Sequence, residues 1–241
     1  MRDRLPARPR DSTSEHSLAT RLLLVRHGAT ERTAEDRFSG SVGIDLSAEG
    51  RAQALRLADR LRHEPIAAAY ASPLSRATET AGLLARPHGL AVAERDGLRE
   101  IDHGRWEGLT RREVEARFGG EYASWDADPF TFAPEGGETG LAVLARALPV
   151  VRELVSAHPD QIVLVVSHKA TLRLLISSLL GFDPRGYRDR LDQAPACLNV
   201  LDFKDATRAR LMLFNDVSHY QSTPRPVAPN LSRWWDKSPS A

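Results

Sequence analysis

Short, wholly apolar runs alternate along this chain with segments of helical spacing, and this alternation constrains the fold more than any other feature. Strands that are apolar throughout are typical of parallel sheets that helices cover on both faces. The runs, with a pair expected to close the sheet last, are residues 22–25, 66–70, 90–93, 162–166, 200–203 and 211–214. We therefore predict an α/β fold, a three-layer α/β/α sandwich around a mostly parallel central sheet.

Two helices in the first half of the chain are expected to begin at residues that cap well. Ser47 precedes a segment in which Ala and Leu recur at helical spacing, so its side chain is expected to cap that helix. Ser72 and Pro73 are expected to begin the next helix, because serine caps helices and proline favours the first helical position.

The second half of the chain is expected to hold two further helices. Residues 98–140 look irregular apart from a helical patch at 111–118. Residues 138–157 have helical spacing, and Pro149 is expected to kink or break the helix that they form. Residues 171–180 make an apolar helical segment that a glycine follows, as is typical at the end of a helix.

We expect a single domain over residues 21–221, because no repeat and no long linker divides this stretch. Residues 1–20 mix proline, arginine and polar residues without periodicity and are expected to be a disordered leader. Residues 222–241 are expected to be a C-terminal tail. Trp234 and Trp235 in this tail either anchor it to the domain or belong to an interface.

The composition argues against several classes of protein. Lys and Arg number 33 against 32 Asp and Glu, and the formal net charge of +1 argues against a nucleic-acid partner. No apolar run reaches the roughly 18 residues of a membrane span, and no apolar segment follows the N-terminal arginines as in a secretory signal. We expect a cytoplasmic protein without a membrane partner. The single cysteine, Cys197, excludes an intramolecular disulfide and a cysteine-built metal site, and we expect it to be buried.

Charged side chains follow three of the predicted strands at the point where each strand ends. Arg26 and His27 follow the first strand, and Arg76 lies shortly after the second. His168 and Lys169 follow the strongest strand, residues 162–166. Because ligands of open α/β sheets bind beyond the carboxyl ends of the strands, these side chains are expected to converge on one edge of the sheet.

These residue types fit phosphate chemistry. A planar guanidinium binds phosphate oxygens through paired hydrogen bonds, and two such groups neutralise a dianion. An imidazole nitrogen can attack phosphorus and form a covalent intermediate, while a second histidine stabilises charge in the transition state. The set lacks an acid for the leaving oxygen. Glu100, in a segment that could fold over the site, would supply one, and Asp102 and Glu107 are neighbouring carboxylates; Glu107 could instead order the loop.

Five sequence blocks resemble those of the histidine phosphatase superfamily, the phosphoglycerate mutase-like enzymes. They carry an Arg-His-Gly motif, a Ser-Pro-x-x-Arg helix, an acid-bearing loop, a Gly-Gly loop and a Ser-His strand end. In order they are residues 24–28, 72–81, 100–108, 134–139 and 165–168. The match covers about residues 21–215, and its implied fold is phosphoglycerate mutase-like.

The resemblance implies a role for each site residue. His27 would accept the phosphoryl group and become phosphohistidine. Arg26, Arg76 and His168 would form the positively charged pocket around that group. Glu100 would protonate the departing oxygen and then deprotonate the hydrolytic water. No metal and no organic cofactor is implied, because the arginines supply the charge that a metal ion supplies elsewhere.

Other positions are expected to contact phosphate or substrate. Thr33 stands where many members have asparagine, and its hydroxyl can still bind a phosphate oxygen. Ser39 and Gly40 resemble the family's phosphate-contacting pair. Lys169 stands where glycine is common, and it contacts substrate either through its side chain or only through its backbone N–H. Arg173, on the helix that follows, either reaches the site or pairs with an acid.

The implied function is that of a phosphomonoesterase acting on a small phosphorylated metabolite, a sugar phosphate or a phosphoglycerate-type ester. Phosphoglycerate mutase activity is the alternative, but mutases of the family carry a long insertion where residues 108–135 are short. A non-catalytic binding module is a further alternative, which the complete set of site residues disfavours. His103 is a candidate to line the pocket, and a homodimer is a family-level expectation. Six aromatic residues near 106–132 either cap the site or form a small core of their own: Trp106, Phe118, Tyr122, Trp125, Phe130 and Phe132.

Overall fold

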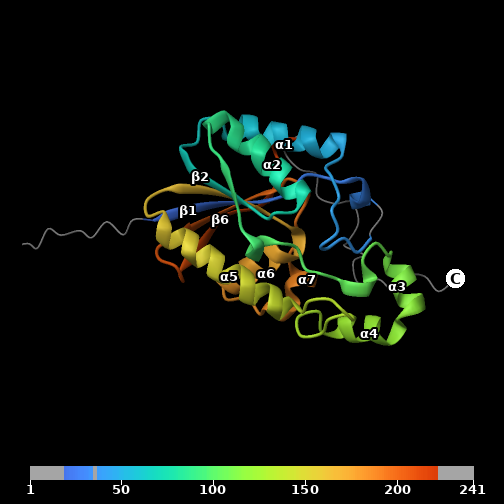
Figure 1. Ribbon diagram of the computed structural model, residues 1–241. Coiled ribbons are helices and arrows are strands. Elements are labelled where there is room, and N and C mark those ends of the chain that lie inside the picture. The colour runs from blue at the N-terminus through green and yellow to red at the C-terminus, as the bar shows by residue number, and fades with distance from the viewer. Residues whose placement is uncertain (1–18, 35–36, 222–241) are drawn as a thin grey trace, which may run out of the picture.

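A computed structural model describes residues 19–34 and 37–221 of the chain, and this part contains a six-stranded sheet of order β3-β2-β4-β1-β5-β6 (Figure 1). The strands are β1 (Thr20–Arg26), β2 (Ile66–Ala71), β3 (Val92–Glu94), β4 (Ile162–Ser167), β5 (Leu198–Phe203) and β6 (Ala209–Asp216). β1, β2, β3 and β4 pair in parallel. β5 is antiparallel to both β1 and β6, so it alone among these strands runs in the opposite direction. The mostly parallel sheet is confirmed.

Helices cover both faces of this sheet. α1 (Ala48–Leu61) and α2 (Ser75–Ala85) lie on one face, and α5 (Gly140–Ala157) and α6 (Lys169–Leu179) lie on the other (Figure 1). The three-layer α/β/α sandwich is therefore confirmed. Beyond the carboxyl ends of the parallel strands lies a pair of short helices, α3 (Arg111–Arg117) and α4 (Gly119–Ala127). The four-residue α7 (Tyr187–Arg190) follows α6.

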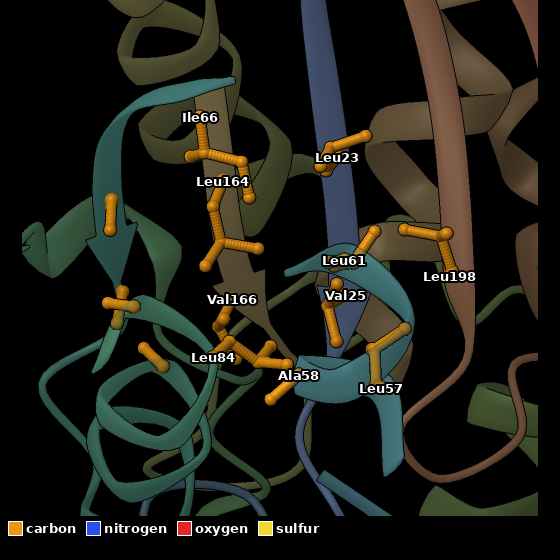
Figure 2. Close-up of a cluster of buried hydrophobic side chains, with 14 of the residues drawn as sticks. Leu23, Val25, Leu57, Ala58, Leu61, Ile66, Leu84, Leu164, Val166 and Leu198 are labelled. Atoms are coloured by element: carbon orange, nitrogen blue, oxygen red, sulfur yellow. The ribbon is translucent and has the colours of Figure 1, made fainter. Parts of the chain in front are cut away.

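Successive residues of β1 point to opposite faces of the sheet and pack into two different hydrophobic cores. Leu23 and Val25 of β1 pack with Leu57 of α1 and Leu84 of α2 (Figure 2). The intervening residues of the same strand point to the opposite face and pack against α5 and α6. A strand whose successive side chains both enter a core must be apolar at every position, which is why the run at residues 22–25 predicts this strand correctly.

The helix boundaries agree with the sequence signals in one case and differ in two. α1 begins after Ser47, whose hydroxyl accepts a hydrogen bond from the Gly50 N–H, as expected. α2 begins at Ser75, not at Ser72 or Pro73, so that prediction is wrong. The Ser72 hydroxyl instead lies 2.7 Å from Nε2 of His168. α5 continues through the exposed Pro149, so the helix does not break there, and a kink at this proline stays a prediction.

The segment expected to be irregular contains α4, which the spacing did not predict. The third strand is confirmed but begins at Val92 rather than at residue 90. β1 begins at Thr20, so the last residue assigned to the disordered leader belongs to the sheet and that boundary is wrong. Residues 1–18 and the tail from 222, with both of its tryptophans, lie outside the described residues. Cys197 is buried as expected, and burial raises its pKa to about 11. Within the described ranges no helix is long and apolar enough to cross a membrane.

Candidate active site

Strand register brings the charged residues to one edge of the sheet. Arg26 of β1 pairs with Ser167 of β4. His27 directly follows the first residue of this pair, and His168 directly follows the second. The backbone N–H of His27 donates to the carbonyl of Ser167 at 3.0 Å. The two imidazole rings lie with their centroids 5.1 Å apart. The predicted convergence of these residues at the carboxyl ends of the strands is therefore present.

His27 is oriented by its neighbour in sequence. Its Nδ1 lies 2.8 Å from the carbonyl oxygen of Gly28, and a carbonyl can only accept, so Nδ1 carries the proton and Nε2 keeps its lone pair. Burial lowers the pKa of His27 well below 6.5, and the charges of Arg26 and Arg76 lower it further. The ring is thus neutral near pH 7, with Nε2 available as a nucleophile.

Gly28 lets the loop after β1 approach the start of α1. A Cβ at Gly28 would lie 2.5 Å from the carbonyl oxygen of Gly50. We expect Gly28→Ala to lower the free energy of unfolding by about 1–3 kcal/mol, because neither backbone segment can yield without moving His27. Gly82, exposed in α2 with open space around it, is the matched control: Gly82→Ala should raise stability by about 0.5–1 kcal/mol. Urea unfolding measures both, and equal effects would contradict this account.

Two arginines hold positive charge at the same edge. The Arg76 side chain is almost fully buried, and its Nη2 and Nη1 donate to the carbonyls of Gly40 at 2.6 Å and Val42 at 2.9 Å. Nη1 of Arg26 donates to the carbonyl of Gln193 at 2.6 Å, while its Nε has no partner among the described residues. Burial lowers the pKa of both guanidinium groups, yet arginine stays protonated in proteins. Because carbonyl oxygens carry no net charge, these partners leave the positive charge of both guanidinium groups available to bind an anion.

His168 is fully buried and held by one hydroxyl. Its Nε2 lies 2.7 Å from Oγ of Ser72, whereas Nδ1 has no hydrogen-bond partner in the described part of the chain. Burial lowers the pKa of His168 well below 6.5, and the neighbouring His27 and Arg76 act in the same direction. Ser72 therefore fixes the orientation of this ring, which lies beside that of His27.

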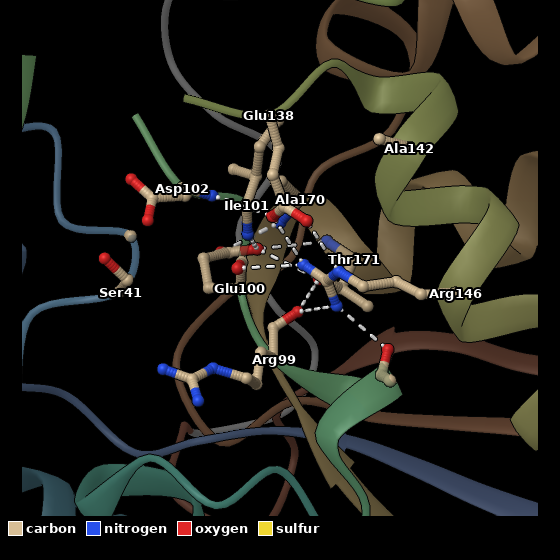
Figure 3. Close-up of polar contacts among 12 residues, drawn as sticks. Ser41, Arg99, Glu100, Ile101, Asp102, Glu138, Ala142, Arg146, Ala170 and Thr171 are labelled. Carbon is tan, nitrogen blue, oxygen red and sulfur yellow. Dashed lines mark hydrogen bonds and ion pairs between the residues drawn. The ribbon is translucent and has the colours of Figure 1, made fainter. Parts of the chain in front are cut away.

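The carboxylate of Glu100 lies at the N-terminus of α6 (Figure 3). It accepts hydrogen bonds from the backbone N–H groups of Ile101 at 3.0 Å, Ala170 at 3.1 Å and Thr171 at 3.1 Å, and from the Thr171 hydroxyl at 3.1 Å. The first N–H groups of a helix have no partner within the helix, and the Glu100 side chain supplies the acceptor for two of them. Glu100 also lines the cavity with His27 and both arginines.

Arg146 of α5 fixes the backbone that carries Glu100. Its guanidinium donates to the carbonyls of Gly97, Arg99 and Glu100 at 2.8–3.0 Å (Figure 3). The Glu138 carboxylate accepts two further hydrogen bonds from the same guanidinium, at 2.9 and 2.8 Å. One side chain from a core helix thereby holds three carbonyls of residues 97–100, in an otherwise irregular segment.

The neighbouring carboxylates have structural partners. Glu107 accepts hydrogen bonds from the backbone N–H groups of Gly40, Ser41 and His103, so it orders the loop, one of the two expected roles. Asp102 accepts from the N–H of Gly104 at 2.7 Å. The N–H of Gly40 donates to Glu107, and its carbonyl accepts a hydrogen bond from Arg76, so Gly40 helps to hold the Arg76 side chain.

The residues at this edge surround a cavity of about 200 Å³. Thr33 and Ser39 line it, and the Thr33 hydroxyl also accepts from the Thr30 N–H at 2.9 Å. Lys169 and Arg173 line it from α6. Several further lining residues follow no strand, and their positions in the sequence do not predict a place in the site: Arg32, Arg37, Arg111, Tyr187 and Arg188. His103, a candidate from its position beside Glu100, lines the cavity as well.

The aromatic residues of the α3–α4 region form a small core of their own. Trp106 and Trp125 are buried there with Val114, and Phe118, Tyr122 and Phe132 pack around them. Phe130 packs elsewhere, beside Ile101 and Tyr187. Of the six aromatic residues expected near the site, Trp125 also lines the cavity. No cluster of three or more His, Cys, Asp or Glu that could hold a metal ion occurs in the described residues.

Comparisons with known proteins agree with this geometry. The model of the histidine phosphatase superfamily (branch 1) matches residues 22–217. The chain is 36% identical to phosphoserine phosphatase 1 of Hydrogenobacter thermophilus over 163 residues, which is 68% of this chain and 77% of that protein. It is 38% identical to glucosyl-3-phosphoglycerate phosphatase of Mycolicibacterium vanbaalenii over 168 residues, which is 67% and 74%.

Solved structures show the same likeness in three dimensions. YhfR of Bacillus stearothermophilus superposes with a TM-score of 0.78 at 30% identity, covering 83% of this chain and 98% of that one. A mycobacterial glucosyl-3-phosphoglycerate phosphatase superposes with a TM-score of 0.74 at 32% identity, covering 82% and 99%. Sequence, fold and site therefore agree that the chain belongs to the histidine phosphatase superfamily, branch 1.

Proposed function

We propose that the protein is a phosphomonoesterase that hydrolyses a small phosphorylated metabolite through a phosphohistidine on His27. One observation carries this proposal: the Gly28 carbonyl holds the His27 ring so that Nε2 keeps its lone pair in a cavity that Arg26 and Arg76 also line. An imidazole in that state is a nucleophile, and the two guanidinium groups neutralise the phosphate that it attacks. Named phosphatases among the relatives support the same reaction.

In the first half-reaction, Nε2 of His27 attacks phosphorus, forming a P–N bond as the bond to the ester oxygen breaks. Arg26 and Arg76, which line the cavity with His27, and His168, whose ring lies beside that of His27, stabilise the charge on the transferring group. Glu100, in its protonated form, gives a proton to the departing oxygen, and the alcohol leaves. The enzyme then holds phosphohistidine and a Glu100 carboxylate.

In the second half-reaction, a water molecule attacks the phosphohistidine. Glu100 takes a proton from this water, the P–N bond breaks, and inorganic phosphate leaves with His27 restored. The N–H groups of Ala170 and Thr171 hold the Glu100 carboxyl in place at the start of α6. Thr33, Ser39 and Lys169 are proposed to contact the substrate from the cavity wall. Gly40 is proposed to act through Arg76, whose Nη2 its carbonyl binds.

A sugar phosphate or a phosphoglycerate-type ester is the proposed substrate class. The named relatives act on phosphoserine and on glucosyl-3-phosphoglycerate, and a cavity of about 200 Å³ suits a small metabolite. A single domain over residues 21–221 remains our proposal for the functional unit. A cytoplasmic location, the absence of a nucleic-acid partner and a homodimer stay predictions from the sequence.

Incubation with 3-phosphoglycerate separates hydrolysis from mutase chemistry. We expect inorganic phosphate and glycerate to accumulate in equal amounts, because residues 108–135 hold two short helices, α3 and α4, and not the long insertion expected of a mutase. Phosphate release and 2-phosphoglycerate are measured in the same samples, alongside a panel of phosphomonoesters that includes p-nitrophenyl phosphate. Formation of 2-phosphoglycerate without free phosphate would establish the mutase instead, and no turnover of any ester would support a non-catalytic binding module.

A further inference from the structure

The wall of the cavity beside His168 is made by two cationic side chains from one face of α6. Lys169 is the first residue of this helix and Arg173 lies four residues later, so both project from the same face. Both line the cavity. The Arg173 side chain is only 7% exposed, and its Nε has no hydrogen-bond partner among the described residues. A buried N–H donor without a partner is costly unless a ligand supplies the acceptor.

One carboxylate of the protein, that of Asp192, contacts both cations. Its Oδ1 lies 3.1 Å from Nη2 of Arg173 and 3.9 Å from Nζ of Lys169. The Asp192 side chain is 64% exposed, so it can move into solvent when another anion takes its place. The N–H groups of Ala170 and Thr171 are already bound to Glu100, which leaves the side chains of Lys169 and Arg173 to bind a ligand here.

The size of the cavity limits the second anion to a small group close to the phosphate. Lys169 directly follows His168, whose ring lies 5.1 Å from that of His27. The cavity of about 200 Å³ is smaller than the roughly 300–1,000 Å³ of a typical pocket for a drug-sized ligand. A carboxylate a few bonds from the phosphate therefore fits better than a second phosphate on a larger skeleton.

We propose that Lys169 and Arg173 form an anion subsite that selects phosphomonoesters carrying a carboxylate a few bonds from the phosphate, with Asp192 as the group that this carboxylate displaces. This inference rests on the proposed phosphatase function, since the phosphate end of the substrate binds at His27. The Lys169 side chain, and not only its backbone N–H, then contacts the substrate.

Matched substrates test the subsite. O-phosphoserine and O-phosphoethanolamine share a phosphate and an ammonium group and differ by one carboxylate, as 3-phosphoglycerate and glycerol 3-phosphate differ by the acid. We expect kcat/KM to be at least about tenfold higher for the acid of each pair, the ratio that one additional ion pair of ordinary strength gives. Fructose 1,6-bisphosphate against fructose 1-phosphate tests a second phosphate, and a preference there without one for the carboxylates would overturn the assignment.

Substitution of the lysine assigns the preference to this wall. Lys169→Gln should reduce the acid-to-neutral ratio of kcat/KM about tenfold, mainly through KM, and Lys169→Arg should restore most of it because it keeps the charge. Lys204→Gln is the matched control. Lys204 follows β5, whose last residue, Phe203, pairs with Thr20 at the start of β1, so it lies at the end of the strands away from the site. An unchanged ratio in Lys169→Gln would overturn the subsite.

Failure of the subsite and failure of the phosphatase give different results. Equal kcat/KM values within both substrate pairs, together with turnover of p-nitrophenyl phosphate, would overturn the subsite and leave the phosphatase in place. No turnover of p-nitrophenyl phosphate or of any paired substrate would overturn the proposed function and the subsite with it.

Discussion

Replacing His27 by alanine is expected to reduce the turnover of p-nitrophenyl phosphate by about a thousandfold or more. The reason is that Nε2 of His27 keeps its lone pair in the cavity that Arg26 and Arg76 line, whereas Nε2 of the second histidine, His168, is held by Ser72. Loss of the nucleophile removes the covalent path altogether, and such losses in other enzymes reach about 10⁶-fold in kcat. Steady-state release of p-nitrophenol measures the effect.

Two controls make this result specific. His63→Ala removes an exposed histidine at the end of α1 and should leave turnover within about twofold of wild type, because surface substitutions rarely disturb a distant site. Circular dichroism and thermal unfolding of His27→Ala should show an intact fold. Wild type mixed with labelled substrate and quenched in alkali should carry acid-labile phosphate that the variant lacks. Retention of more than a tenth of the activity would contradict the mechanism.

The positions of the main site residues could be predicted from the sequence because strand ends are predictable. A strand buried on both faces is a continuous apolar run, and the residue that follows it lies at the ligand-binding edge of a parallel sheet. His27 and His168 follow such runs directly, and the register of β1 with β4 brings them together. The position of Arg76 could be predicted from the end of the second strand, because this residue lies in the first turn of the helix that follows.

Residues that act through tertiary contacts could not be predicted in this way. Ser72 has the sequence features of a helix cap, yet its hydroxyl binds His168, ninety-six positions away in the chain. Arg146 lies in a helix with ordinary spacing, and nothing local indicates that it holds the backbone of Glu100. Arg188 reaches the cavity from α7 and stacks on Trp125, an arrangement that depends on how α4 packs.

The α3–α4 region shows why helices far from the sheet are harder to predict. α4 begins at Gly119, directly after Phe118, and two glycines open it, so neither its propensity nor a polar cap indicates a helix. Its stability comes from Trp125 and Tyr122 packing on Trp106, which lies outside both helices. α3, by contrast, has a capping box between Thr110 and Glu113, a local signal that the sequence displays.

Replacing Glu100 by glutamine should affect two substrates to different extents, and this difference tests its role as the acid. An alkyl ester such as glycerol 3-phosphate needs a proton on its leaving oxygen, so its turnover should fall by about 100- to 10,000-fold. p-Nitrophenolate leaves without a proton near neutral pH, so formation of phosphohistidine from p-nitrophenyl phosphate should slow far less. Its hydrolysis still needs a base, because glutamine cannot take a proton from the attacking water.

Glu100→Gln is therefore expected to release p-nitrophenol in a burst of about one equivalent per active site and then to accumulate phosphohistidine. Rapid-quench measurements with labelled substrate follow both events. Glu115→Gln, which neutralises an exposed carboxylate on α3, is the matched control and should show wild-type kinetics. Equal losses on the two substrates, with no burst and no accumulated intermediate, would mean that the carboxylate only supports the start of α6. The four hydrogen bonds that it accepts would then be its whole function.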